Sequence, residues 1–593
     1  LEAIQQQFNG ADPGVELQEL IDGTYNIDYY SIGSYVSPQL FPKYDAEGKE
    51  LPLDDQVWPE DLSTKKAPAV GEDVYFTLSI PRKEVSARKD GKQVPVILLG
   101  HGYTGNRFDV LSFSSFFARH GFAVLGIDGP SHGLSLSSTE QLLARGLLKG
   151  YGIEAAGDAL LLDRARDQNN DGTKDSGADF WTSYLFHTRD MVRQYAVDTM
   201  QLVRILRGFD GAAKWAHDTN GDGQPDLAGD FDGDGKVDIG ADSPLFYFGG
   251  SLGGIMAMVN GGVEPGIDAI APVSGGGGYA DLGPRSTQSG VPEAFILRVM
   301  GPLFVGTTDP DTGEMLLETI VADLNDDATY PIATITGVKP WDTMVVINQR
   351  NGKRRCAFVE PSGIVRASNE TDVGDPLRIE FYAGPQVLPS EDCKLREGAE
   401  PYRIVEQFEQ EFNFQETIHS PGEPLVALME GLGLRRGHPD FRRLSGLSQM
   451  ILDPSDPAVL AQYWQREPLV YTATGEQTGT HALVITTMGD TAVPVSGGIL
   501  VGRSSGIVPY LENDPRFGEP ANQHYIDTYT TEGVNTLKRY TDPQGDGVHL
   551  DIEDFSGGDD LYGAAIPRAE VPMRIGFEGQ DLLGGKSAHI VPY

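Results

Sequence analysis

The sequence is short of basic residues and of long apolar runs, and each shortage excludes a class of protein. Its 593 residues include 46 Lys and Arg against 86 Asp and Glu, which gives a formal net charge of −40. This surplus of negative charge argues against nucleic acid or an anionic membrane surface as a partner, and it fits a protein that holds cations. The longest apolar runs, such as residues 94–99, are too short to span a bilayer, so we expect no transmembrane segment.

Cysteine is also scarce, because Cys356 and Cys393 are the only two. In an exported protein they could pair as a disulfide, and two separate thiols are the alternative. The given chain begins at Leu1 without a signal peptide, so we expect a processed form or a fragment of a protein that is secreted or anchored to the cell envelope. The length suggests roughly two to four structural units, one of which could be an α/β core with large insertions.

The strongest chemical signal is the run Gly249-Gly250-Ser251-Leu252-Gly253, which has the pattern G-x-S-x-G. An apolar strand leads into it and an apolar helix follows, the context in which this pattern forms a nucleophile elbow. Ser251 is the predicted nucleophile. The N–H of Leu252 would lie at a helix N-terminus, where an unpaired amide can stabilise an oxyanion. A glycine-rich turn without a catalytic role is the alternative.

Two further apolar strands precede the elbow. Residues 95–99 end in His101-Gly102-Tyr103, residues 122–127 end in the run 128–135, and the helix expected between them implies a right-handed parallel crossover. Together with the elbow, these runs resemble the α/β-hydrolase superfamily and, within it, large exported bacterial esterase and lipase-like proteins.

The resemblance covers roughly residues 74–290 and 440–500. It implies a mostly parallel sheet with helices on both faces, and it makes the N–H of Tyr103 the second oxyanion donor beside Leu252. We expect His101 and His132 to shape their loops rather than to act in catalysis.

The same resemblance directs the search for the acid and the base of a Ser-His-Asp triad. Asp490 follows the apolar strand 481–488 and is the predicted acid, with Asp281 as second choice. In this superfamily the histidine comes after the acid, which leaves His524, His549 and His589. We predict His549 as the base. The alternative is a histidine beyond Tyr593.

Three Asp-rich stretches have the spacing of calcium-binding loops. Each places oxygen ligands at loop positions 1, 3, 5 and 9, with a glycine at position 6 that permits a sharp turn. The predicted ligands are Asp167, Asn169, Asp171 and Asp175 in the first loop, Asp218, Asn220, Asp222 and Asp226 in the second, and Asp230, Asp232, Asp234 and Asp238 in the third. The Glu that an EF-hand has at position 12 is missing, so the loops are more similar to dockerin or thrombospondin calcium repeats. We predict structural Ca²⁺ here, because these carboxylates would repel one another without a cation; solvated acidic loops are the alternative.

The pattern of the whole chain predicts an interrupted core. We expect a β and loop extension in residues 1–70, the first part of the α/β-hydrolase core in residues 71–300 with calcium loops at about 163–180 and 216–242, an inserted β-sandwich in residues 330–400, and the second part of the core in residues 401–593. Residues 290–330 are expected to form a packing helix or a lid. Helices are expected at residues 406–414 and 441–464.

These observations predict a secreted or envelope-anchored, calcium-stabilised serine hydrolase that cleaves carboxylic esters of small molecules or lipids. An amidase or peptidase with the same triad is one alternative. A non-catalytic, calcium-dependent surface protein for adhesion or carbohydrate binding is the other.

Overall fold

The computed structural model describes most of the chain between residues 24 and 524 and one strand near its end. The described residues are 24–41, 49, 51, 56–59, 69–166, 174–177, 179–182, 184–215, 218, 223–286, 288, 291, 298–321, 329–387, 393–414, 417–434, 439–487, 490–508, 513, 515, 517–520, 523–524 and 588–592. The chain divides into two compact units. Unit 1 comprises Leu1–Arg166, Tyr184–Ser286 and Gln449–Tyr593, and unit 2 comprises Asp167–Ser183 and Thr287–Ser448.

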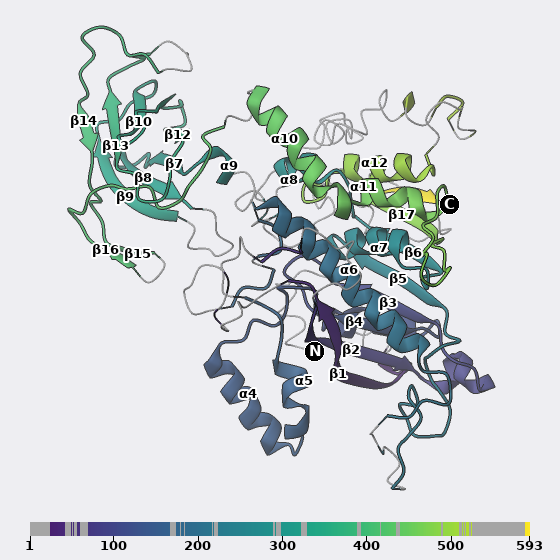
Figure 1. Cartoon of the computed structure of the whole chain (residues 1–593). Coiled ribbons are helices and arrows are strands. Elements are labelled where there is room, and N and C mark those ends of the chain that lie inside the picture. The colour runs from purple at the N-terminus through teal and green to yellow at the C-terminus, as the bar shows by residue number, and fades with distance from the viewer. Residues whose placement is uncertain are drawn as a thin grey trace, which may run out of the picture. The chain divides into compact units, whose positions relative to one another are not determined.

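Unit 1 is built on an eight-stranded sheet with the strand order β1-β2-β4-β3-β5-β6-β17-β18 (Figure 1). In this order the strands are β1 (Ile27–Gln39), β2 (Val70–Pro81), β4 (Ala123–Ile127), β3 (Val96–Gly100), β5 (Leu245–Gly250), β6 (Ala269–Val273), β17 (His481–Thr487) and β18 (Ala588–Pro592). The five strands from β4 to β17 run parallel, whereas β2 and β18 pair antiparallel with them and β1 pairs antiparallel with β2. Every residue of β3 and β4 is buried, as expected for parallel strands covered on both faces. The predicted α/β class with a mostly parallel sheet is confirmed.

Helices cover both faces of this sheet, as the side chains of β5 show. Successive side chains of a strand point to opposite faces. Phe248 packs against the ring of Phe117 in α3 (Asp109–Ala118), whereas the neighbouring Tyr247 hydrogen-bonds with Tyr195 in α6 (Leu185–Arg207). α3 and α6 therefore lie on opposite faces. The other helices described in unit 1 are α4 (Ser138–Gly150), α5 (Gly157–Leu161), α7 (Leu252–Val263), α8 (Tyr279–Arg285), α11 (Pro457–Leu460) and α12 (Val495–Ser505).

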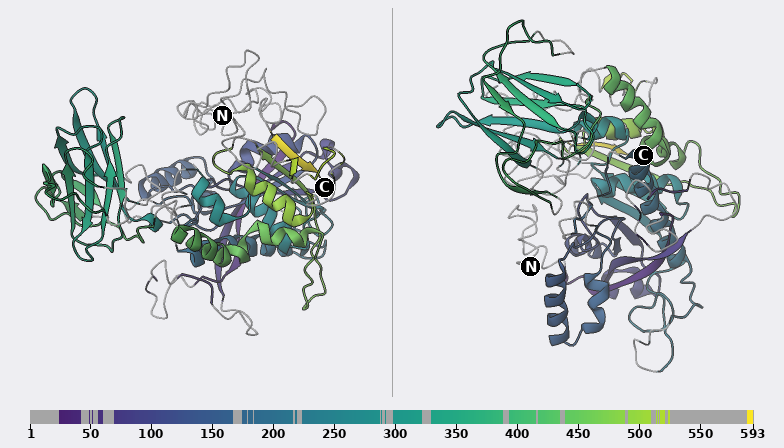
Figure 2. Two further views of the ribbon diagram at one scale, coloured as in Figure 1. Left: turned by 90° about the horizontal axis from the view of Figure 1, so that it is seen from above. Right: turned by 60° about the vertical axis from the view of Figure 1, so that its left-hand side comes forward.

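Unit 2 contains two four-stranded antiparallel sheets that share one apolar core. One sheet has the order β11 (Arg354–Phe358), β10 (Thr343–Asn348), β13 (Leu377–Tyr382), β14 (Arg403–Val405), and the other has the order β12 (Ile364–Ser368), β7 (Leu303–Thr308), β8 (Glu314–Ile320), β9 (Thr329–Thr336). Met315 and Leu317 from one sheet and Ile379 and Phe381 from the other belong to the same buried cluster. A hairpin of β15 (Phe412–Phe414) and β16 (Thr417–His419) and the helices α9 (Arg298–Met300) and α10 (Pro439–Leu452) complete the elements of this region. Figure 2 gives two further views of these strands.

Two expectations about these residues are wrong. Over residues 303–320 of the region expected to hold a packing helix or a lid, the chain instead forms β7 and β8, and alternate side chains of β8 are buried with the period of a strand. The helix expected at residues 406–414 is absent, because residues 406–411 are irregular and residues 412–414 form β15 of the β15–β16 hairpin. Phe408 and Phe412 are four residues apart, the spacing of one helical face, and this spacing suggested a helix. In the structure their rings contact each other edge to face, with centroids 5.1 Å apart, at the core of unit 2.

Two other expectations concern the cysteines and the membrane. Cys356 and Cys393 form the predicted disulfide, so the alternative of two separate thiols is wrong. Among the residues that the structure describes, every helix is too short or too polar to span a bilayer.

Candidate active site and candidate cation site

Ser251 lies in the tight turn between β5 and α7, in a backbone conformation that few residues adopt. Its φ is 54° and its ψ is −119°. A positive φ in a residue other than glycine is strained and persists only where neighbouring contacts hold it. The N–H of Ser251 donates to the carbonyl of Val273 at 3.0 Å, and its own carbonyl accepts from the N–H of Ile255. This is the geometry that the G-x-S-x-G pattern predicts for a nucleophile.

Glycines allow the elbow to form against the neighbouring strand. A Cβ on Gly253 would lie 2.0 Å from the carbonyl oxygen of Gly100, and a Cβ on Gly249 would lie 2.6 Å from the carbonyl carbon of Gly253. The start of α7 therefore packs backbone to backbone against the end of β3. Leu252 is the first residue of α7, so its N–H has no acceptor within the helix.

Asp490 lies after β17, at the same edge of the sheet as Ser251. Gly250 at the end of β5 pairs with Val273, and Val273 pairs with Ile485 in β17. Two strand intervals of about 4.8 Å each thus separate β5 from β17, which leaves room for an imidazole ring between the two side chains.

The carboxylate of Asp490 is buried and held by three donors. Its Oδ1 accepts the N–H groups of Ala492 and Val493, each at 2.9 Å, and the hydroxyl of Ser274 also donates to the carboxylate. Burial nevertheless raises the pKa of Asp490 to about 6, because the lost hydration outweighs these hydrogen bonds. A cationic imidazolium beside Asp490 would favour its charged form again.

The loop after β3 orients the second predicted oxyanion donor. The carbonyl of Gly102 accepts the N–H of Gly105 at 3.0 Å and lies 2.8 Å from Nδ1 of His101. The N–H of Gly129 donates to Nε2 of His101 at 3.0 Å, so Nδ1 must carry the proton and donate to Gly102. In a trans peptide the N–H opposes the carbonyl, and the N–H of Tyr103 consequently points away from His101.

His101 has the loop-shaping role expected from the sequence. Both of its ring nitrogens bond to the backbone, and burial lowers its pKa to about 4. It is therefore neutral near pH 7. His132 is fully buried and bonds through Nδ1 to the carbonyl of Pro130.

Several residues with a strained backbone lie at the carboxyl edge of the parallel strands. Seven residues other than glycine have a positive φ in the described part of the chain, and five of them follow the carboxyl ends of β3, β4, β5 and β6: Thr104, Ser131, Ser135, Ser251 and Ser274. Strained conformations cluster at functional sites because the surrounding structure must hold them. The carboxyl edge is also where open α/β sheets bind their ligands.

The predicted triad base, His549, lies outside the described residues, and none of the described histidines bonds to Asp490. His524 stacks on Phe517 and bonds to Glu519, while the backbone of His589 belongs to β18. The second-choice acid, Asp281, is exposed on α8 and pairs with Arg285, whereas the acid of a Ser-His-Asp triad is buried beside its histidine.

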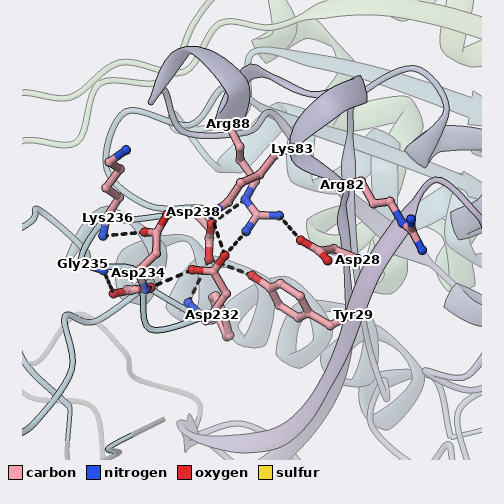
Figure 3. A network of polar contacts seen from close by, with 12 residues as sticks. Asp28, Tyr29, Arg82, Lys83, Arg88, Asp232, Asp234, Gly235, Lys236 and Asp238 are labelled. Atoms are coloured by element: carbon pink, nitrogen blue, oxygen red, sulfur yellow. Dashed lines mark hydrogen bonds and ion pairs between the residues drawn. The ribbon is translucent and has the colours of Figure 1, made fainter. Parts of the chain in front are cut away.

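The third Asp-rich loop forms a candidate cation site (Figure 3). Carboxylate oxygens of Asp230, Asp232 and Asp238 all lie within 4.8 Å of one another. The two oxygens of Asp230 accept the N–H groups of Asp234 and Gly235, which folds the loop around this carboxylate. Burial raises the pKa values of Asp230 and Asp238, because the lost hydration outweighs the hydrogen bonds and the ion pair that these carboxylates make.

Two basic residues from η2 (Lys83–Val85) and η3 (Ala87–Asp90) already contact this loop. Arg88, whose side chain is 2 % exposed, binds Asp238 and Asp232 at 2.6 Å and Asp28 at 2.8 Å. Lys83 binds Asp234 at 2.6 Å and Asp232 at 3.1 Å. Lys236 of the loop adds a third positive charge near Asp234 (Figure 3). These cations neutralise only part of the charge, since three of them face the four loop carboxylates and Asp28.

The other two predicted loops are described only in part. Asp175, Asp218 and Asp226 belong to the described residues, whereas Asp167, Asn169, Asp171, Asn220 and Asp222 lie outside them. The N–H of Gly223 donates to Asp218 at 2.9 Å, which is the contact that Gly235 makes with Asp230 in the third loop. The second loop thus starts with the same local turn as the third.

Sequence patterns gave no signal for the residues that hold the predicted site residues in place. Ser274, the residue directly after β6, is buried and bonds to Asp490, and Asp109 at the start of α3 accepts the N–H of Gly102. The only local hint for Ser274 was its place directly after a predicted strand. Arg88 lies more than 100 residues away from the loop that it neutralises.

Among the comparisons with known proteins, only the comparison with solved structures finds matches, and these include esterases. No protein-family model and no curated protein matches the chain. Similar solved structures include a cold-adapted esterase from an Arctic intertidal metagenomic library (12% identity, TM-score 0.17, 34% of this chain and 54% of that chain) and a thermostable carboxyl esterase from Bacillus coagulans (14% identity, TM-score 0.20, 43% and 48%). An acetyl xylan esterase from Paenibacillus sp. R4 matches with 12% identity and a TM-score of 0.19, over 44% of this chain and 57% of that chain. The matches thus span about half the length of those proteins.

Proposed function

We propose that this protein is a serine hydrolase that cleaves carboxylic esters. The observation that carries the proposal is the backbone of Ser251, with its φ of 54° at a turn packed by glycines between a parallel strand and a helix. Strained residues cluster at functional sites, and this turn places Ser251 at the carboxyl edge of the sheet, where open α/β sheets bind their ligands.

In the proposed reaction Ser251 attacks the acyl carbon, and a histidine accepts the proton of its hydroxyl. The N–H groups of Leu252 and Tyr103 bind the oxyanion of the tetrahedral intermediate, each contributing about 2.7–4 kcal/mol as such donors typically do. Asp490 fixes the tautomer of the histidine and favours its charged form. The histidine then returns the proton to the leaving alcohol, and water releases the acyl group by the same route.

A fluorophosphonate probe tests this proposal directly, because it reacts with activated serines. We expect the full chain, in calcium-containing buffer, to be labelled at Ser251, with the modified peptide identified by mass spectrometry. A folded protein that stays unlabelled would overturn the proposal and favour a non-catalytic binding protein. Labelling together with cleavage of amides but not of esters would instead support the amidase or peptidase alternative.

The role of Asp490 is tested by the variant Asp490→Asn. The amide oxygen of Asn can still accept from Ala492 and Val493, so the fold should persist, but the charge that favours an imidazolium is gone. We expect kcat for a p-nitrophenyl ester to fall by about 10⁴-fold. Asp281→Asn is the matched control and should retain wild-type kcat, since Asp281 is exposed on α8. A folded Asp490→Asn protein with near wild-type kcat would remove Asp490 from the mechanism.

We further propose that calcium binds at the Asp-rich loops and stabilises the fold. The support is the cluster of Asp230, Asp232 and Asp238, whose carboxylate oxygens all lie within 4.8 Å of one another, and the raised pKa values of Asp230 and Asp238. An ion there would share Asp232 and Asp238 with Arg88 or displace its guanidinium. Oxygen-only ligands suit Ca²⁺.

We expect exhaustive dialysis against EGTA to lower the melting temperature by several degrees, and added Ca²⁺ to restore it, because an ion that binds only the native state stabilises it. Asp230→Asn should reduce this shift. Asp230 is the best position to change, since its partners described here are backbone N–H groups and Arg88 is left intact. Asp281→Asn should keep the full shift. Identical melting curves with EGTA and with Ca²⁺ would contradict structural calcium.

We also propose that the protein works outside the cytoplasm. The disulfide between Cys356 and Cys393 supports this, since disulfides persist mainly in oxidising compartments.

A further inference from the structure

Trp341 of unit 2 is exposed in a backbone conformation that disfavours its bulky side chain. The N–H of Asp342 donates to the carbonyl of Lys339 at 3.1 Å, so residues 339–342 form a β-turn with Trp341 in its third position. The φ of Trp341 is 73°, which marks a type II turn, and the third position of that turn favours glycine. Because 56% of Trp341 is exposed, packing recovers little of the strain. Because strained residues cluster at functional sites, we infer that the exposed Trp341 has a function.

The turn that carries Trp341 is held by a buried carboxylate. Asp342 accepts the N–H groups of Lys339 at 3.0 Å and Gly384 at 2.8 Å, and it accepts the hydroxyl of Tyr402 at 3.0 Å. The N–H of Trp341 itself donates to the carbonyl of Val359 at 2.7 Å. These bonds fix the turn, so the ring of Trp341 is presented to solvent from a rigid base.

Tyr402 provides a second ring tied to the same carboxylate. It is 42% exposed, and Trp341 and Tyr402 are the two aromatic residues with exposed side chains in the described part of unit 2. Its ring also contacts Phe381 in the core of unit 2. Aromatic side chains held in this way offer a large contact area and lose little conformational entropy when a ligand binds.

The charges next to these two residues indicate an uncharged ligand. Arg403, adjacent to Tyr402, pairs with Glu409. Glu360, adjacent to Val359, pairs with Arg366 and accepts the hydroxyl of Ser362. These two pairs are each neutral, the exposed Lys339 of the turn adds one positive charge, and the net charge of −40 disfavours an anion.

We propose that Trp341 and Tyr402 form a binding surface for a neutral polysaccharide. The apolar C–H face of a pyranose ring stacks on an aromatic ring, and its hydroxyls can accept from a donor such as the amino group of Lys339 or bond to the neutral ion pairs nearby. A flat, rigid, solvent-facing ring is what such stacking requires. This proposal is independent of ester hydrolysis, because it uses residues of unit 2 alone.

Retention of the full-length protein on insoluble xylan, microcrystalline cellulose and chitin tests the proposal. We expect retention on at least one of them that persists at high salt, since stacking does not depend on charge. Trp341→Gly should lower the affinity by about tenfold or more, as loss of a central tryptophan contact does. The melting temperature of this variant should be unchanged or higher, because glycine adopts a φ of 73° without strain. Loss of binding by a folded Trp341→Gly variant would then result from the missing ring and not from misfolding.

Matched variants separate this role from general effects. Val373→Ala changes another exposed apolar residue of unit 2 and should leave retention unchanged. Ser251→Ala should bind as the wild type does, so failure of the hydrolase proposal and failure of this one remain distinguishable. Lack of wild-type retention on all three polysaccharides, or equal retention of Trp341→Gly, would overturn the proposal. Capture of a proline-rich peptide without polysaccharide binding would do the same.

Discussion

Replacing Ser251 with alanine is expected to lower kcat for a short-chain p-nitrophenyl ester by about 10⁶-fold, as loss of the nucleophile does in a serine protease. Alanine removes only the hydroxyl oxygen. The contacts that hold the elbow are made by backbone atoms of residue 251 and by Gly100, Gly249 and Gly253, and all of them remain. The loss should therefore appear in kcat without a loss of fold. Steady-state kinetics and a melting curve, measured on the same preparation, check both parts.

Ser251→Gly is the matched control for strain at this position. Glycine also lacks the hydroxyl, so its activity should fall as far as that of Ser251→Ala. Glycine tolerates a φ of 54° better than serine or alanine, and its melting temperature should exceed that of both. Wild-type hydrolysis by either folded variant would show that another residue is the nucleophile.

The elements nearest to the chemistry were predictable because their signals are local. Gly249 to Gly253 specify a turn that only small residues permit, and the apolar runs before Ser251 and Asp490 predict the strands that end beside them. Each of these signals lies within about ten residues of sequence, and each determines which residues reach the carboxyl edge of the sheet.

The contacts that tune the site were not predictable in this way. Ser274 and Asp490 meet only because β6 and β17 are neighbours in the sheet, although more than 200 residues separate them. Arg88 and Lys83 meet the third Asp-rich loop through a similar long-range contact, and the sequence pattern of that loop predicted a metal ion without any sign of these two cations. The spacing of residues in a loop identifies the carboxylates that could bind a metal ion. Which basic side chains compete with the ion for those carboxylates depends on the tertiary fold.

The direction of β18 bears on the identity of the triad histidine. β18 pairs antiparallel with β17, and Ala588 at its start pairs with Thr487 at the end of β17. The connection between the two strands thus leaves and returns at the edge where Ser251 and Asp490 lie, and His549 belongs to that connection. β18 itself leads away from this edge by about 3.4 Å per residue, so a histidine soon after Tyr593 would start near the opposite edge. This favours His549 over a base beyond Tyr593.

We therefore expect His549→Ala to lower kcat by about 10⁴-fold or more, because Ser251 would lose the base that accepts its proton. Labelling of Ser251 by the fluorophosphonate should slow in parallel, since that reaction also needs an activated hydroxyl. His524→Ala and His589→Ala are the controls. His524 bonds to Glu519 and should be dispensable. His589 is the sharper control, because its backbone pairs with Thr486 near the same edge. If His589→Ala loses activity and His549→Ala keeps it, then His589 is the base and the assignment of His549 is wrong.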